Sequence, residues 1–108
     1  NIDLAIKLSK KEESSSYYTK AVTLSCLADN IYQKKNDDGD NEQIEYTDAD
    51  AKISAANKYI EYLTEANENF QKYISLEPNS GDIGNIQTEI DRNNEEISKK
   101  RAENNLDD

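Results

Sequence analysis

The side chains best able to do chemistry in this chain are carboxylates. The 108 residues include 23 Asp and Glu, no His and one Cys. Glu61 and Glu65 lie on one helix face and resemble the inward carboxylates of di-iron helical bundles, yet those sites also use a Glu-x-x-His element. The absence of His also excludes Ser-His and Cys-His nucleophile pairs. We therefore expect solvated carboxylates, no cofactor and no enzyme activity.

Oxygen-bearing side chains also gather in the acidic stretch 36–45. Calcium loops of the helix-loop-helix type place such ligands at alternating positions and end in a Glu. Four of the positions are filled here: Asn36, Asp38, Gly39 and Glu45. Lys34 stands where the first Asp belongs, and Asn41 occupies the apolar position after the glycine. We expect an exposed connector without a metal site, and keep an acidic, extracytoplasmic calcium- or ligand-binding module as the alternative function.

Seven tyrosines, in a chain without Trp, indicate a possible contact surface. Tyr is enriched in interfaces because its ring is largely apolar and its hydroxyl hydrogen bonds. Three tyrosines lie on or beside apolar helical stripes, where core packing accounts for them: Tyr17, Tyr32 and Tyr59. Others lie off the centre of their stripe or on the back of the first long helix. We predict a partner-binding surface from four residues of this second kind: Tyr18, Val22, Tyr62 and Tyr73.

The formal net charge of −10 restricts the partners of the chain. Binding to DNA or RNA depends on Lys and Arg that displace counterions from phosphates, so we expect no nucleic-acid partner. Anionic membrane surfaces likewise recruit clustered Lys and Arg. No apolar stretch approaches the ~20 residues needed to cross a bilayer, so we expect no direct membrane insertion. The expected partner is a basic protein or a second copy of this chain.

The single cysteine, Cys26, has no partner for an internal disulfide. Its neighbours Leu24, Leu27 and Ala28 are apolar, which is typical of the flank of a packed helix. We expect Cys26 to be a small buried or half-buried apolar residue rather than a reactive thiol. The cellular compartment is left open by this reading.

The clearest element is the run from Asp48 to Leu76, which contains neither Gly nor Pro. Its apolar residues recur at helical spacing: Ala49, Ile53, Ala56, Ile60, Leu63, Phe70 and Ile74. A second apolar strip runs beside the first: Ala51, Ala55, Tyr62, Ala66 and Tyr73. Two strips predict two neighbours, which makes this helix the central element; the alternative is that the second strip meets a partner. Thr47 is the expected N-cap, and Pro78 prevents the helix from continuing.

Two further helices are expected, over about 15–35 and 82–102. The first follows an apolar line: Tyr17, Ala21, Leu24, Ala28 and Ile31. The apolar face of residues 1–13 falls out of phase after Ser14, which predicts a separate turn or a kinked lead-in. The last helix carries a narrow seam: Ile83, Ile86, Ile90 and Ile97. Residues 104–108 are predicted to be a polar tail or linker.

Ala66, Phe70 and Pro78 have the spacing of the small residue, the aromatic residue and the closing proline in the second helix of a tetratricopeptide repeat. Over residues 57–79 the chain therefore resembles a degenerate repeat of this family. Asp50 departs from the pattern, because a large apolar residue belongs at its position. The resemblance implies a scaffold for protein contacts, in which the last helix caps the stack and solvates it.

These observations predict an all-α fold with a single helical domain over 1–103. Its architecture is an antiparallel three-helix bundle, or a tetratricopeptide-like helical hairpin plus a capping helix. The absence of Met, even at residue 1, leads us to expect part of a longer chain. The predicted function is that of a non-catalytic protein-interaction or structural module.

Overall fold

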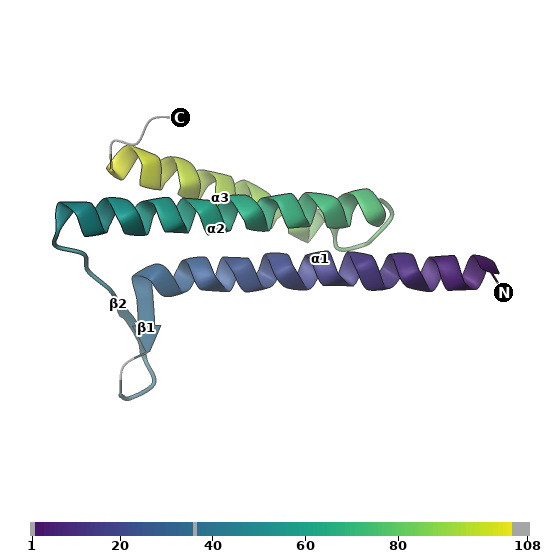
Figure 1. Cartoon of the computed structure of the whole chain (residues 1–108), viewed down its shortest axis with the longest axis horizontal. Coiled ribbons are helices and arrows are strands. Elements are labelled where there is room, and N and C mark those ends of the chain that lie inside the picture. The colour runs from purple at the N-terminus through teal and green to yellow at the C-terminus, as the bar shows by residue number, and fades with distance from the viewer. Residues whose placement is uncertain (1, 36, 105–108) are drawn as a thin grey trace.

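The computed structural model describes residues 2–35 and 37–104. In that part of the chain there are three helices and a two-stranded antiparallel sheet (Figure 1). In chain order the elements are α1 (Ile2–Tyr32), β1 (Gln33–Lys35), β2 (Asn41–Gln43), α2 (Ala49–Leu76) and α3 (Ile83–Glu103). The fold is therefore an all-α helical bundle, as the sequence predicts.

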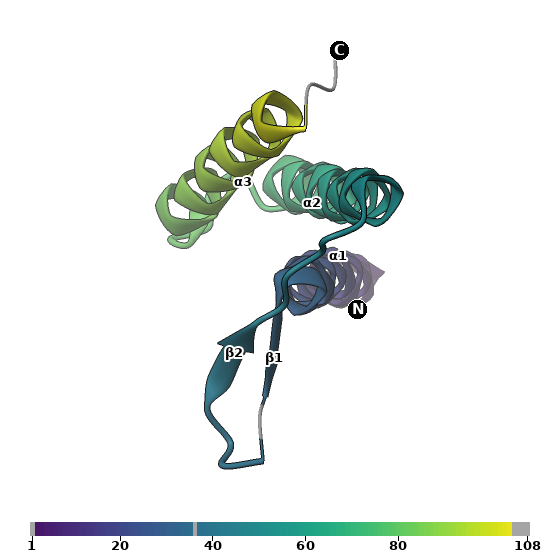
Figure 2. The ribbon, with the colours of Figure 1, turned by 90° about the vertical axis from the view of Figure 1, so that its left-hand side faces the viewer.

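α2 is the central element of the bundle. α1 and α3 each run antiparallel to α2 and pack against it, whereas α1 and α3 scarcely contact each other. Figure 2 shows the consequence along the helix axes: the three helices form an open angle rather than a closed triangle. The two apolar strips of α2 account for its two neighbours, which confirms its predicted central position.

Two clusters of buried residues form the core, one towards each end of α2. The first joins all three helices: Ala28, Tyr59, Ile60, Leu63 and Ile97. The second does the same: Ala21, Phe70, Ile86 and Ile90. Ala21 and Ala28 have no exposed surface, so α1 approaches α2 closely where it presents a methyl group. A larger side chain at either position would overpack the interface, at a cost of about 1–3 kcal/mol.

α1 is one continuous helix through Ser14, so the predicted separate turn over 1–13 and the helix start near residue 15 are wrong. Ser14 is buried, with 1% of its surface exposed. Its hydroxyl donates to the Lys11 carbonyl at 2.9 Å and lies 3.0 Å from a carboxylate oxygen of Glu77. Because the hydroxyl is satisfied in this way, a polar residue can occupy the packed face and the helix continues across the phase break.

The acidic connector after α1 contains a hairpin that the sequence analysis did not anticipate. Its strands pair in the register Gln33↔Gln43, Lys34↔Glu42 and Lys35↔Asn41. Gly39 has a φ of 83° in the turn, a value that glycine adopts without the steric cost of a Cβ. The amide of Ile44 donates to the carbonyl of Tyr32 at 2.7 Å, so α1 ends there and not near residue 35.

The ends of α2 follow the sequence signals closely. Asp48, not the predicted Thr47, is the N-cap, because its carboxylate accepts the Ala51 amide at 3.3 Å. At the other end the Glu77 amide still bonds back into the helix, and Pro78 begins the turn. The predicted bounds, 48–76, therefore agree with α2 to within one residue.

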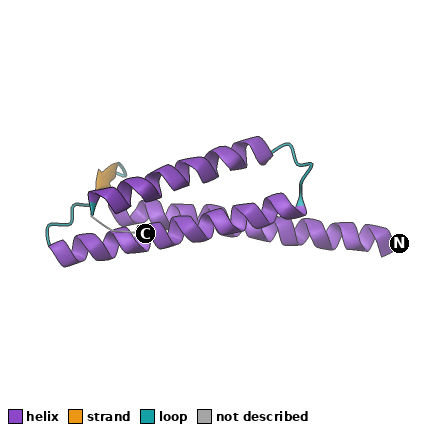
Figure 3. Ribbon diagram, turned by 90° about the horizontal axis from the view of Figure 1, so that it is seen from above, coloured by secondary structure: helices purple, strands orange, loops and turns teal. Residues whose placement is uncertain are grey.

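α3 also agrees with its predicted range, 82–102, to within one residue. Asn104, the first residue of the predicted tail, closes α3 by donating from its side chain to the Lys100 carbonyl at 3.0 Å. The rest of that tail, 105–108, lies outside the described residues. Seen from above, α1 continues past the turn between α2 and α3 (Figure 3). Among the described residues, no helix is both long and apolar enough to span a bilayer.

Candidate functional site

A groove runs between α1 and α3, with α2 beneath it. It has a volume of about 490 Å³ and exists because the two outer helices pack on α2 without closing on each other. One wall comes from α1, where Tyr18 and Asp29 mark its two ends. Phe70 of α2 lies beneath, and the other wall runs along α3 from Asp82 to Arg92. The site thus has the shape of a channel between two helices.

The lower part of this groove is apolar. Phe70 and Ile86 are nearly fully buried, with 3% and 2% of their surface exposed. Above them, Tyr18 is 41% exposed and Val22 is 40% exposed. The Tyr18 ring meets the Phe70 ring edge to face at a centroid distance of 6.0 Å, and the Tyr73 ring at 5.5 Å. Tyr18 is therefore held in place by two rings on one side and open on the other.

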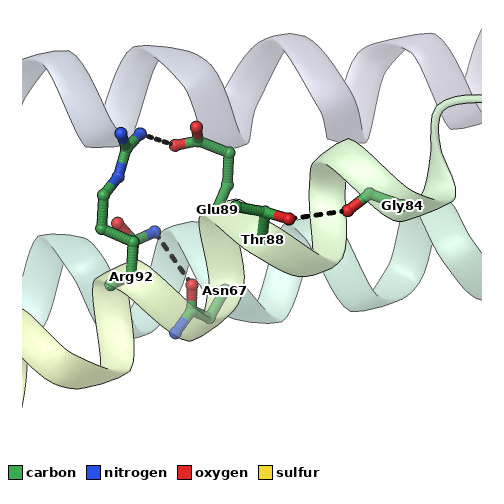
Figure 4. A network of polar contacts seen from close by, with 6 residues as sticks. Asn67, Gly84, Thr88, Glu89 and Arg92 are labelled. Carbon is green, nitrogen blue, oxygen red and sulfur yellow. Dashed lines mark hydrogen bonds and ion pairs between the residues drawn. The ribbon is translucent and has the colours of Figure 1, made fainter.

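The upper rim of the groove is acidic. Asp29 lies on the α1 wall, and Asp82 and Glu89 lie on the α3 wall. Arg92 is the one cation among the lining residues, and it pairs with Glu89; both side chains point from α3 towards α1 in Figure 4. Burial raises the pKa of the Asp29 carboxyl, and although Arg92 opposes this shift, Glu89 adds to it. The residues that line the rim thus carry a net negative charge.

Two further α1 residues line the groove and could accept polar contacts. The hydroxyl oxygen of Ser25 is shielded from solvent and has no hydrogen-bond partner within the described part of the chain. Cys26 is exposed, so its predicted burial is wrong. Leu24 and Ala28 face α2, and Cys26 lies two residues from each, about 200° around the helix.

The structure brings together three of the four residues predicted to form a contact surface. Tyr18 and Val22 line the groove, and Tyr73 packs beside Tyr18 with its hydroxyl 3.1 Å from that of Ser80. Tyr62 lies apart, against the other core cluster, where the Lys58 ammonium is 5.8 Å from its ring centroid. The predicted surface is therefore divided between two places.

The polar residues of the α3 wall were not predicted from the sequence. Its residues sit at polar positions beside the isoleucine seam: Asp82, Asn85, Thr88, Glu89 and Arg92. Thr88 and Glu89 make local bonds along α3, to the Gly84 carbonyl and to Arg92 (Figure 4). No spacing in the sequence indicates which neighbour they face, because that depends on how α3 inclines across α2.

A second polar cavity lies at the hairpin end of the bundle and is lined in part by Tyr32, Tyr46 and Lys100. The Tyr46 hydroxyl donates to the Ile31 carbonyl at 2.6 Å, and the Tyr32 ring contacts the Tyr59 ring at a centroid distance of 5.1 Å. Burial is the main cause that raises the pKa of Tyr59, to about 12. The phenol therefore stays neutral near pH 7, and the ring contact between Tyr32 and Tyr59 ties α1 to α2.

The carboxylates weighed for catalysis or metal binding do not converge. Glu61 is exposed and Glu65 is half-buried on α2. Asp38 lies in the turn of the hairpin and Glu45 beyond β2, while Asn36 is outside the described residues. In the ranges 2–35 and 37–104, no three or more Asp, Glu, His or Cys side chains form a group able to hold a metal ion.

Comparison of the chain with protein-family models, with curated proteins and with solved structures finds no match. Function is therefore inferred from the shape, exposure and charge of the groove.

Proposed function

We propose that this domain is a non-catalytic protein-interaction module whose binding surface is the groove between α1 and α3. One observation carries the proposal: Tyr18 and Val22 stay about two-fifths exposed directly above buried Phe70, in a channel that no other element of the described chain covers. Exposed apolar side chains that continue into a packed core are typical of contact surfaces.

The shape of the groove suits a helix. Tyr18 and Asp29 are eleven residues apart on α1, which corresponds to roughly 16 Å at 1.5 Å per residue. About three turns of a partner helix would span that length. An amphipathic helix in such a groove would place residues i, i+3, i+4 and i+7 on the floor, which is a common mode of peptide recognition. The bound helix would take the place of a fourth helix in the bundle.

The resemblance to a tetratricopeptide repeat forms part of this proposal. In it, α1 and α2 are a helical hairpin and α3 is the capping helix. Supporting observations are that Ala66 and Phe70, at the repeat's small and aromatic packing positions, are buried with 0% and 3% exposed surface. Pro78 follows directly in the turn between α2 and α3. Proteins built from such hairpins use the surfaces between helices to hold other proteins.

Site-specific photo-crosslinking in cells that express the protein would test the proposal. A benzophenone side chain at Val22 should give an adduct with another protein, and the same group at exposed Glu61 on α2 should not. The purified adduct partner should then bind the unmodified protein and lose at least about tenfold in affinity to Val22→Asp. Equal adducts from both positions, or equal affinity of the variant, would refute a binding role for the groove.

Self-association is the competing form of the same function. Light-scattering chromatography across a wide range of protein concentration distinguishes it. A monomer at all concentrations supports an external partner, whereas a dimer that Val22→Asp dissociates would make a second copy the occupant. Val22 is not a core residue, since 40% of its surface is exposed, so we expect the variant to keep its helical circular dichroism.

A further inference from the structure

We infer that the partner bound in the groove between α1 and α3 is a basic amphipathic helix of another protein. The inference rests on the proposed function, and it adds the chemistry of the partner. It follows from three features of the groove: the sign of its rim, the partial desolvation of Asp29, and the unpaired hydroxyl of Ser25.

Carboxylates outnumber cations on both walls of the groove. Asp29 of α1 faces the α3 wall, where Asp82 and Glu89 also carry carboxylates. The single lining cation, Arg92, is paired with Glu89. The lining therefore carries three carboxylates against one cation, which acts on Asp29 as well as on Glu89. A helix carrying Lys or Arg on both sides of its apolar face would meet negative charge on either wall, as complementary interfaces do.

Covering the groove changes the solvation of Asp29. Partial desolvation already raises the pKa of this exposed carboxyl; Arg92 opposes the shift, and nearby Glu89 and Glu96 add to it. A neutral or acidic lid would remove more water from Asp29 without replacing its hydration. A Lys or Arg from the partner would supply a charged hydrogen-bond donor instead. A cationic partner therefore pairs with the Asp29 carboxylate, and its binding carries the smallest free-energy penalty for removing water from Asp29.

Ser25 points to the same kind of ligand. Its hydroxyl oxygen is buried in the α1 wall and has no partner within the described residues. A buried polar atom that lacks a hydrogen bond is unfavourable, so binding that supplies a donor gains from it. Lys and Arg side chains are donors only, which suits an oxygen with free lone pairs.

A second copy of this chain fits the groove less well. Each copy carries a formal charge of −10, so two copies repel one another at a distance. Nucleic acid is excluded on the same ground. A basic helix from a different protein would be attracted to the acidic domain rather than repelled by it. This long-range electrostatic attraction also accelerates association.

Three synthetic peptides test the inference by fluorescence anisotropy. Each is about 14 residues long, roughly four helical turns, with the same Leu and Ala face and with Lys, Gln or Glu on the polar face. Because Lys, Gln and Glu have similar helix propensities, differences in binding report charge rather than helicity. A fourth peptide has the Lys composition in scrambled order, which removes the apolar face. At about 0.15 M salt we expect the Lys peptide to bind about tenfold tighter than the Gln peptide, and the scrambled peptide more weakly than either.

Two double variants test whether the effect of charge on peptide affinity arises in the groove. Asp29→Asn with Glu89→Gln removes two negative charges from the rim and should weaken the Lys peptide about three- to tenfold. Glu61→Gln with Glu68→Gln removes the same charge from exposed positions of α2 that do not line the groove, and should change the affinity less than about twofold. Binding of the Gln peptide should be insensitive to both pairs.

The outcomes separate the two proposals. If the Gln peptide binds as tightly as the Lys peptide, or if both variant pairs weaken the Lys peptide equally, the basic partner is refuted while the groove stands. If none of the amphipathic peptides distinguishes the unmodified protein from Val22→Asp, the groove itself is refuted as a binding surface. If the protein forms a dimer that the Lys peptide does not displace but Val22→Asp abolishes, the occupant is a second copy.

Discussion

The ammonium nitrogen of Lys100, near the end of α3, lies 4.0 Å from the centroid of the Tyr32 ring, at the end of α1. The same nitrogen is 5.8 Å from the Tyr59 ring of α2 and 3.3 Å from a carboxylate oxygen of Glu103. α1 and α3 make few direct contacts within the described residues, so this cation–π contact is a direct link between helices that are joined mainly through α2.

Replacing Lys100 with Gln should therefore destabilise the domain. Lys100 is mostly shielded from solvent, and the loss of a partly desolvated cation–π contact costs about 1–2 kcal/mol. For a domain of this size that corresponds to a fall in Tm of roughly 4–16 °C. Urea and thermal unfolding measure the change. Lys99→Gln, on the exposed side of the same turn, should change Tm by less than about 2 °C, and an equal loss for both variants would contradict the cation–π role.

The stability of the domain should decline in alkali. Burial is the largest cause of the raised pKa of Tyr59, which is about 12 against an ordinary value of 10.0, and nearby carboxylates add to it. A group whose pKa is raised on folding contributes stability that is complete below the unfolded value and is lost as the pH rises through the folded value. The loss from Tyr59 therefore falls between about pH 10 and about pH 12.

Urea midpoints across this pH range measure the effect, with tyrosinate absorbance as the direct readout. Tyr59→Phe should have a smaller alkaline decline than the unmodified protein, because one of the groups that resist ionisation is gone. Tyr32, whose pKa burial also raises, leaves a residual slope. A decline unchanged by Tyr59→Phe would contradict the assignment.

An amide pair links α2 to α3 in the interior of their interface. The side-chain amide of Asn93, which is 6% exposed, donates to the Asn67 oxygen at 2.9 Å. Asn93→Ala removes that donor and leaves the Asn67 oxygen poorly paired, which should cost about 1–3 kcal/mol in urea unfolding. Asn94→Ala is the matched control, because its bond to Asn67 is exposed, and should cost less than about 0.5 kcal/mol. Similar costs for the two variants would show that burial of the pair does not matter.

Calcium should leave the domain unchanged. Asp38 and Glu45 are separated by β2, and no described group of carboxylates converges on one point. We therefore expect neither millimolar calcium nor a chelator to change Tm or the mass in solution. A rise in Tm with calcium, or a calcium-dependent change of mass, would instead favour the alternative of a calcium-binding module.

The sequence predicted α2 and α3 well because their boundaries depend on local chemistry. Asp48 caps one helix and Pro78 stops it, and both effects act within one turn of the chain. The phase break at Ser14 misled the prediction of α1, since the partner that satisfies its hydroxyl, Glu77, is distant in sequence. Only the folded structure brings those two residues together.

The hairpin and the groove could not be predicted from the sequence, for related reasons. The strands of the hairpin are short and polar, so they lack the alternation of apolar residues that announces a half-buried strand. Tyr18 and Val22 could be recognised as lying off the main stripe of their helix. Asp82 and Glu89 could not be assigned to the same surface, because their position relative to α1 is set by the packing of α3 on α2.

α1 and α3 pack on α2 through interfaces of different size, and this difference affects how the bundle opens. α3 is attached mainly along one side of α2, through a smaller interface than the one between α1 and α2, and through Lys100 to the end of α1. Its amide hydrogens should therefore exchange with solvent through a local detachment that leaves the α1–α2 hairpin intact. Because α3 supplies one wall of the groove, that detachment also erases the binding surface. A bound helix would then slow amide exchange in α3 far more than in α2. Occupancy of the groove and amide exchange in α3 therefore both measure the equilibrium between attached and detached α3.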